Sequence, residues 1–131
     1  MTRIWVYQRM VADPVLITLV GARVHQSTSL VVAPSVKPFL MYRQTSDTTI
    51  FRGDDGDMVR QTGYMIFAHD EPGDYLRIDS IMEELKRLFA DTKDTVARVV
   101  KSSWLETSED FRDDDMGTIA RFARILVKYK A

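Results

Sequence analysis

Apolar residues between positions 75 and 89 recur with the period of an α-helix, and this pattern limits the possible folds more than any other feature. They follow one another in steps of three and four: Tyr75, Ile78, Met82, Leu85 and Phe89. Ile81 and Leu88 widen the stripe, while charged side chains occupy the opposite face. A stripe of this kind is stable only against a second layer, so we predict an amphipathic helix packed on a sheet.

The sheet is predicted from four segments with strand propensity. Residues 39–45 have strand propensity, and residues 58–69 alternate between apolar and polar side chains. The turn-forming residues at 47–57 between them indicate a hairpin with a long acidic tip. We expect the connection 45–57 to be mobile in the free subunit. Residues 96–107 and 118–130 predict a second long hairpin, separated by an acidic tract and Gly117.

The N-terminal segment predicts two helices joined by a corner. Thr2 is expected to cap the first helix, in which three apolar residues fall at helical spacing: Ile4, Tyr7 and Val11. Asp13 can cap a short second helix with Pro14 at its first position and Gly21 as its stop. Residues 22–26 are expected to form an edge strand and residues 27–37 a loop.

Length and composition indicate that these elements form one domain. With 131 residues, 45% of them hydrophobic, the chain is expected to form a single domain over residues 1–131. The predicted class is α+β: a mixed, mostly antiparallel β-sheet with one long amphipathic helix and a helical N-terminus packed on it. The longest apolar stretch, residues 15–20, is too short to span a bilayer, so no membrane association is expected.

No catalytic, metal or cofactor site is predicted. The chain has no Cys, and its two histidines, His25 and His69, lie in no hydrolase or zinc motif. Asp54, Asp55 and Asp57 are of the residue type that binds calcium, but their spacing does not match the twelve-residue loop and no Glu closes it. Glycine-rich phosphate loops are missing as well, so we expect a protein that is not an enzyme.

The segment 118–130 carries apolar residues in both of its alternating sets of side chains. A strand that is partly apolar on two faces and rich in Arg is typical of a protein interface. We therefore expect a subunit interface built from Arg121, Phe122, Arg124, Leu126 and Lys128. The acidic tract 109–115 of a neighbouring copy is the predicted partner of this basic strand.

The order of these elements resembles the tail terminator, or tail completion, proteins of long-tailed bacteriophages. The likeness is carried by residues 11–14 with Leu16, by the Leu-Val-Gly-Ala-Arg-Val segment 19–24, by the strand 38–44 and by the helix 75–89. The resemblance implies a structural virion protein that forms a ring, commonly of six subunits. Such a ring caps the tail tube, ends its polymerisation and joins the tail to the head-side connector or stopper protein.

The resemblance also implies where the protein works. It is expected at the head-proximal end of the tail in the virion, after assembly in the host cytoplasm, with itself, the tail tube protein and the connector as partners. Because DNA passes through the ring without specific binding, an acidic lumen is favoured. The lumen candidates are Asp54, Asp55, Asp57, Asp113, Asp114 and Asp115. Solvated outer loops remain the alternative for both clusters.

Two other functions stay open at the level of sequence. A head-closure protein, or another head–tail connector of similar size, would share the composition and the interface-like strands. A small α+β enzyme or ligand-binding domain using the Asp clusters or His69 would instead need a pocket with convergent polar groups.

Overall fold

The computed structural model describes residues 2–26, 36–53 and 58–131, and it confirms the predicted α+β class. Asp54, Asp55, Asp57 and most of the predicted loop 27–37 lie outside the described residues. Three helices are described: α1 (Thr2–Ala12), α2 (Pro14–Val20) and α3 (Tyr75–Phe89). The described strands are β1 (Val24–Gln26), β2 (Phe39–Arg52), β3 (Met58–Asp70), β4 (Thr92–Asp94), β5 (Val99–Thr107), β6 (Phe111–Asp113) and β7 (Thr118–Lys130).

The strands form one mixed sheet in the order β1-β2-β3-β7-β5-β4, with β6 paired to β7. Only β1 and β2 run parallel, and the remaining described pairs are antiparallel. The two long predicted hairpins therefore meet in the middle of the sheet, because β3 pairs with β7 from Val59 opposite Lys130 to Asp70 opposite Ile119.

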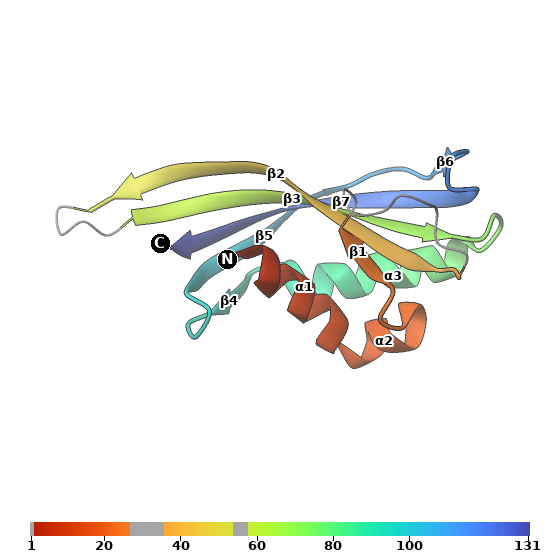
Figure 1. The fold of residues 1–131 in the computed structure, drawn as a ribbon, viewed down its shortest axis with the longest axis horizontal. Coiled ribbons are helices and arrows are strands. Elements are labelled where there is room, and N and C mark those ends of the chain that lie inside the picture. The colour runs from red at the N-terminus through yellow and green to blue at the C-terminus, as the bar shows by residue number, and fades with distance from the viewer. Residues whose placement is uncertain (1, 27–35, 54–57) are drawn as a thin grey trace.

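All three helices lie on the same face of this sheet (Figure 1). The hydrophobic core fills the space between the two layers. From α3 it takes Ile78, Ile81, Met82, Leu85, Leu88 and Phe89, and from the central strands Tyr64, Ile66, Ala123, Ile125 and Val127. These strand residues share the core face because side chains two positions apart on a strand point to the same side of the sheet.

The corner between α1 and α2 follows the sequence signals. The Asp13 carboxylate accepts a hydrogen bond from the Leu16 backbone N–H at 3.0 Å, so Asp13 is the predicted N-cap, and Pro14 occupies the first turn. Gly21 ends α2 with a φ of 63°, a conformation that glycine adopts without strain. The edge strand β1 within residues 22–26 is also confirmed.

Two expectations for α1 are wrong. Thr2 does not act as a cap: it is the first helical residue, and its buried hydroxyl bonds the hydroxyls of Thr62 and Tyr64. The helix also buries a different stripe from the one expected, because Ile4 and Tyr7 are exposed. The residues it turns towards the sheet are Thr2, Trp5, Val6 and Met10.

The connection predicted at 45–57 is wrong in its extent, because residues 45–52 belong to a strand, while its mobility in the free subunit stays a prediction. Strand β2 continues to Arg52, which pairs with Met58 of β3. Turn-forming residues such as Asp47 are held in the strand because β3 supplies a hydrogen-bonding partner along this length, and two register shifts near Thr45 and Ile50 absorb the irregularity. The result is an arm that extends beyond the helical layer (Figure 1).

The second hairpin contains two short strands that the sequence pattern did not separate. Residues 95–98 form a turn between β4 and β5, so β5 begins at Val99 rather than at position 96. The acidic tract holds β6, in which Asp113 pairs with Thr118 of β7. The predicted antiparallel pairing of β5 with β7 is confirmed.

Candidate functional site

The sheet face opposite the helices is the first candidate for a functional surface. Strand register places four of the five predicted interface residues on it, because they alternate along β7: Phe122, Arg124, Leu126 and Lys128. Phe122 and Leu126 are half-buried, and the Arg124 side chain is 52% exposed, with its guanidinium 3.1 Å from Glu106 of β5. This group combines an apolar centre with accessible cations.

Arg121 is the predicted interface residue that the structure separates from the others. Because side chains alternate along β7, Arg121 points to the helix-covered face of the sheet, where its guanidinium lies 2.8 Å from the Asp79 carboxylate of α3. The same side chain donates to the Ser108 carbonyl oxygen at 3.1 Å. Arg121 therefore ties α3 to the β5–β6 connection within its own chain.

Towards the Phe122 end, the same face carries a second apolar cluster. Phe39, Met41, Met65, His69 and Ala120 are buried outside the main core. The Phe67 ring lies 5.6 Å from the Phe122 ring, centroid to centroid, and the Phe39 ring stacks on His69 at 4.9 Å. This side of the sheet is therefore more apolar than a solvated face requires.

His69 is part of that cluster, where its ring is hydrogen-bonded to a hydroxyl and stacked on a second ring. Its Nδ1 lies 2.8 Å from the Thr118 hydroxyl, and its side chain is buried against Phe39. Burial lowers the pKa of His69, an effect that the charge of Asp113 opposes. A neutral, hydrogen-bonded and stacked histidine is a packing residue of this face.

The β2–β3 arm is a second candidate surface. Along β2 every residue from Thr45 to Arg52 is exposed, including two large apolar side chains, Ile50 at 46% and Phe51 at 61%. Arg60 of β3 lies 3.0 Å from Asp47 across the arm. Since β1 pairs only with residues 40–42, the outer edge of β2 beyond Tyr42 has no strand beside it among the described residues.

The structure describes only some of the acidic residues that are candidates for the lumen wall. Asp54, Asp55 and Asp57 lie outside the described residues. Asp113 lies in β6 and accepts a hydrogen bond from the Met116 backbone N–H at 3.1 Å, whereas Asp114 is exposed and 3.8 Å from Arg112. In the described part of the chain, no group of three or more His, Asp or Glu side chains is arranged to hold a metal ion.

A basic cluster of Lys93, Arg98 and Lys130, which the sequence reading missed, lies where β4, β5 and the end of β7 meet. Arg98 and Lys130 together line two adjoining hollows of about 420 and 470 Å³. Among the described residues, these three cations take part in no ion pair. Lys93 and Arg98 are five residues apart, but Lys130 is more than thirty residues further on, so charge patterning along the chain does not reveal the cluster.

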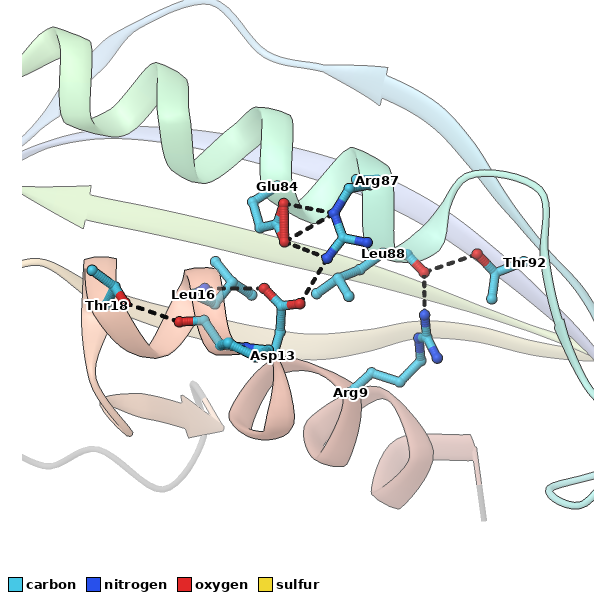
Figure 2. A network of polar contacts seen from close by, with 9 residues as sticks. Arg9, Asp13, Leu16, Thr18, Glu84, Arg87, Leu88 and Thr92 are labelled. Atoms are coloured by element: carbon cyan, nitrogen blue, oxygen red, sulfur yellow. Dashed lines mark hydrogen bonds and ion pairs between the residues drawn. The ribbon is translucent and has the colours of Figure 1, made fainter.

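The densest network of charged side chains joins α2 to α3 (Figure 2). The Arg87 guanidinium donates a hydrogen bond to Asp13 at 2.7 Å, and it also donates to both carboxylate oxygens of Glu84. Burial raises the pKa of Asp13, while the hydrogen bonds from Arg87 lower the pKa of Glu84. Because Asp13 also caps α2, both oxygens of the Asp13 and Glu84 carboxylates are hydrogen-bonded, and we assign these contacts to helix packing rather than to chemistry.

Comparisons with known proteins identify the fold. The chain is similar to a chain of the solved structure described as "Virion of native gene transfer agent (GTA) particle". The two share 16% sequence identity with a TM-score of 0.71 over 96% of this chain and 92% of the other. No protein-family model and no curated protein sequence matches. Within the described residues, no helix is long and apolar enough to cross a membrane.

Proposed function

We propose that this protein is a structural component of a phage-like virion. In this role it forms a ring that caps the tail tube, ends tube polymerisation and joins the tail to the head-side connector. The observation that carries the proposal is the fold likeness to a virion chain, since it extends over 96% of this chain and 92% of the other. A likeness over nearly the full length of both chains favours a shared architecture rather than a shared local motif.

The surfaces described above fit an assembly role better than a catalytic one. Phe122, Arg124 and Leu126 form a partly apolar, Arg-containing patch on the face that α1, α2 and α3 leave uncovered. Interfaces favour this combination of apolar and Arg side chains. The arm adds exposed Ile50 and Phe51 at a distance from the helical layer, where a neighbouring subunit can be reached.

We assign the subunit contact to this patch and the arm, and we leave Arg121 out of it. Replacing Arg121 would break its contact with Asp79 of α3 and disturb the fold of the subunit itself. Arg124 and Leu126 are better probes, because the Arg124 side chain is 52% exposed and Leu126 is only half-buried.

The test measures the mass of the purified protein over a range of concentrations, followed by electron microscopy. Wild type is expected to form closed rings, whereas Arg124→Glu with Leu126→Glu is expected to remain a folded monomer. The matched control is Ile17→Glu on α2, which changes an apolar side chain of 47% exposure on the helical side. Circular dichroism checks that each variant is folded.

The second part of the test uses a candidate tail tube protein from the genome that encodes this chain. Wild type added during tube polymerisation is expected to give tubes of limited length with a ring at one end. Binding to a head-side connector without any effect on tube length would instead favour a head-closure protein. A wild type that stays monomeric at every concentration and leaves tube growth unchanged contradicts the proposal.

A further inference from the structure

The basic cluster of Lys93, Arg98 and Lys130 has the features of a binding surface. Its two hollows share Arg98 and Lys130 as lining residues, and no Asp or Glu of the described chain lines either one. Exposed apolar side chains lie beside the cations, with Val96 at 94% and Val100 at 43% exposure. Cations without partners next to exposed valines indicate a surface suited to an acidic partner that also supplies apolar contacts.

The backbone around Arg98 holds this residue at a defined place in the β4–β5 turn. Arg98 has a φ of 61°, in the left-handed region that glycine and asparagine adopt more readily. The turn is held by a hydrogen bond from the Arg98 N–H to the Thr95 carbonyl at 3.2 Å, and the Arg98 carbonyl accepts from the Lys130 N–H at 3.0 Å. Asp91, just before β4, also has a positive φ, of 52°, so this conformation fixes the position of Arg98 in the turn and does not by itself assign a role to the guanidinium.

The opposite end of the molecule carries the complementary charge. The β3–α3 turn and the two connections around β6 carry three exposed carboxylates that take part in no ion pair of the described residues: Glu71, Glu109 and Asp115. Two cations lie at this end as well, because Lys37 donates to the Gly117 carbonyl oxygen and Arg112 lies 3.8 Å from Asp114, so the end is predominantly rather than wholly acidic. Exposed apolar side chains lie beside this acidic end too, with Tyr75 at 47% and Leu76 at 83% exposure. The C-terminus and the β4–β5 turn point toward one end of the long axis, and β6 lies at the other (Figure 1).

We propose that the basic cluster receives the acidic end (Glu71, Glu109 and Asp115) of a second copy of this chain, so that copies join end to end. Like charges prevent either end from pairing with itself, so the contact is heterologous and leads to a closed ring or an open filament. The inference rests on the proposed self-assembly, but not on what the ring caps. It adds a second contact to the one assigned to the β7 patch and the arm, and both are expected to be needed for assembly. It gives the acidic tract around Asp115 a subunit contact rather than a place on the lumen wall.

Charge reversal followed by mixing tests the proposal. One variant carries Arg98→Glu and Lys130→Glu, and the other carries Glu109→Lys and Asp115→Lys. Each alone is expected to assemble about tenfold more weakly than wild type or worse, since attraction becomes repulsion at the contact. An equimolar mixture is expected to assemble again, because each reversed end then meets its complement, and raising the salt concentration weakens every attractive combination.

A milder variant separates assembly from folding. Arg98→Gly removes the strain of a positive φ at position 98 together with the guanidinium. The melting temperature of this variant is expected to match or exceed that of wild type, while its assembly weakens. The matched control is Lys86→Glu on the exposed side of α3, which removes a cation away from the cluster and should leave assembly unchanged.

The outcomes distinguish this inference from the proposed function. If wild type assembles and both reversed variants assemble equally well, or if mixing restores nothing, end-to-end docking is wrong while the ring proposal stands. A wild type that never assembles contradicts both. If the basic cluster instead binds duplex DNA, so that Arg98→Glu with Lys130→Glu loses DNA binding without any change in mass, the cluster is a nucleic-acid surface and the proposal is overturned.

Discussion

The Asp13 network allows a stability prediction with a magnitude worked from its contacts. Replacing Asp13 with Ala removes the carboxylate that caps α2 and leaves the Leu16 N–H without its partner. Loss of such a cap costs about 1 kcal/mol. It also removes an acceptor from Arg87, but that side chain is 61% exposed and keeps Glu84, so this loss adds only about 0.5 kcal/mol. We expect Asp13→Ala to lower the free energy of unfolding by about 1.5 kcal/mol.

The matched variant is Asp13→Asn, because asparagine caps helices about as well as aspartate but carries no charge. Burial raises the pKa of Asp13, which means that the ionised form is already disfavoured at this position. Removing the charge should therefore cost less than about 0.5 kcal/mol, and the difference between the two variants, about 1 kcal/mol, is the contribution of the cap.

Urea unfolding and thermal unfolding, both followed by circular dichroism, measure these differences at a concentration where the protein is monomeric. Asp13→Ala is expected to lower the melting temperature by about 5 °C, and Asp114→Ala, an exposed carboxylate, is expected to leave it unchanged. If the Ala and Asn variants lose the same amount, the charge rather than the cap stabilises this corner. If neither loses more than about 0.3 kcal/mol, the network is not a stabilising contact.

Two more predictions concern buried polar groups. Because burial lowers the pKa of His69, the unfolded chain binds the proton first, and stability is expected to fall as pH drops from about 6.5 through the lowered pKa, by up to about 1.4 kcal/mol per pH unit. His69→Gln should flatten this dependence in urea unfolding at several pH values; an unchanged slope would assign it to another group. Tyr64→Phe is expected to cost about 1 kcal/mol, because it removes a buried hydroxyl bonded to Thr2. Tyr7→Phe, at 38% exposure, should cost less than about 0.5 kcal/mol, and equal losses in the two variants would contradict the role of the buried hydroxyl.

Local signals in the sequence located several elements correctly. Asp13, Pro14 and Gly21 each act through the backbone of their own turn, so the corner and the end of α2 could be predicted without knowledge of the rest of the chain. Strand β3 was located in the same way, because alternation between the two faces of a strand is itself a local pattern. The absence of Cys excluded thiol chemistry on composition alone.

The buried face of α1 could not be chosen from the sequence. One helical stripe contains Ile4 and Tyr7, and another contains Val6 and Met10 with Trp5 beside them, and both have helical spacing. The tertiary structure selects the second, because the Trp5 indole N–H reaches Asp94 at 3.0 Å while its ring packs edge-on against Phe89. These partners are more than eighty residues away in the chain.

The candidate surfaces depend on the sheet in the same way. The sequence by itself determined that residues 118–130 form a strand with two partly apolar faces and that acidic and basic residues gather in separate segments. Only the tertiary structure decided that Arg121 faces α3 while Arg124 faces outwards, that β2 continues into an arm, and that Lys93, Arg98 and Lys130 meet. The physical reason is that helix caps and alternation act between neighbours in sequence, whereas strand pairing and charge clusters join residues that only the folded sheet brings together.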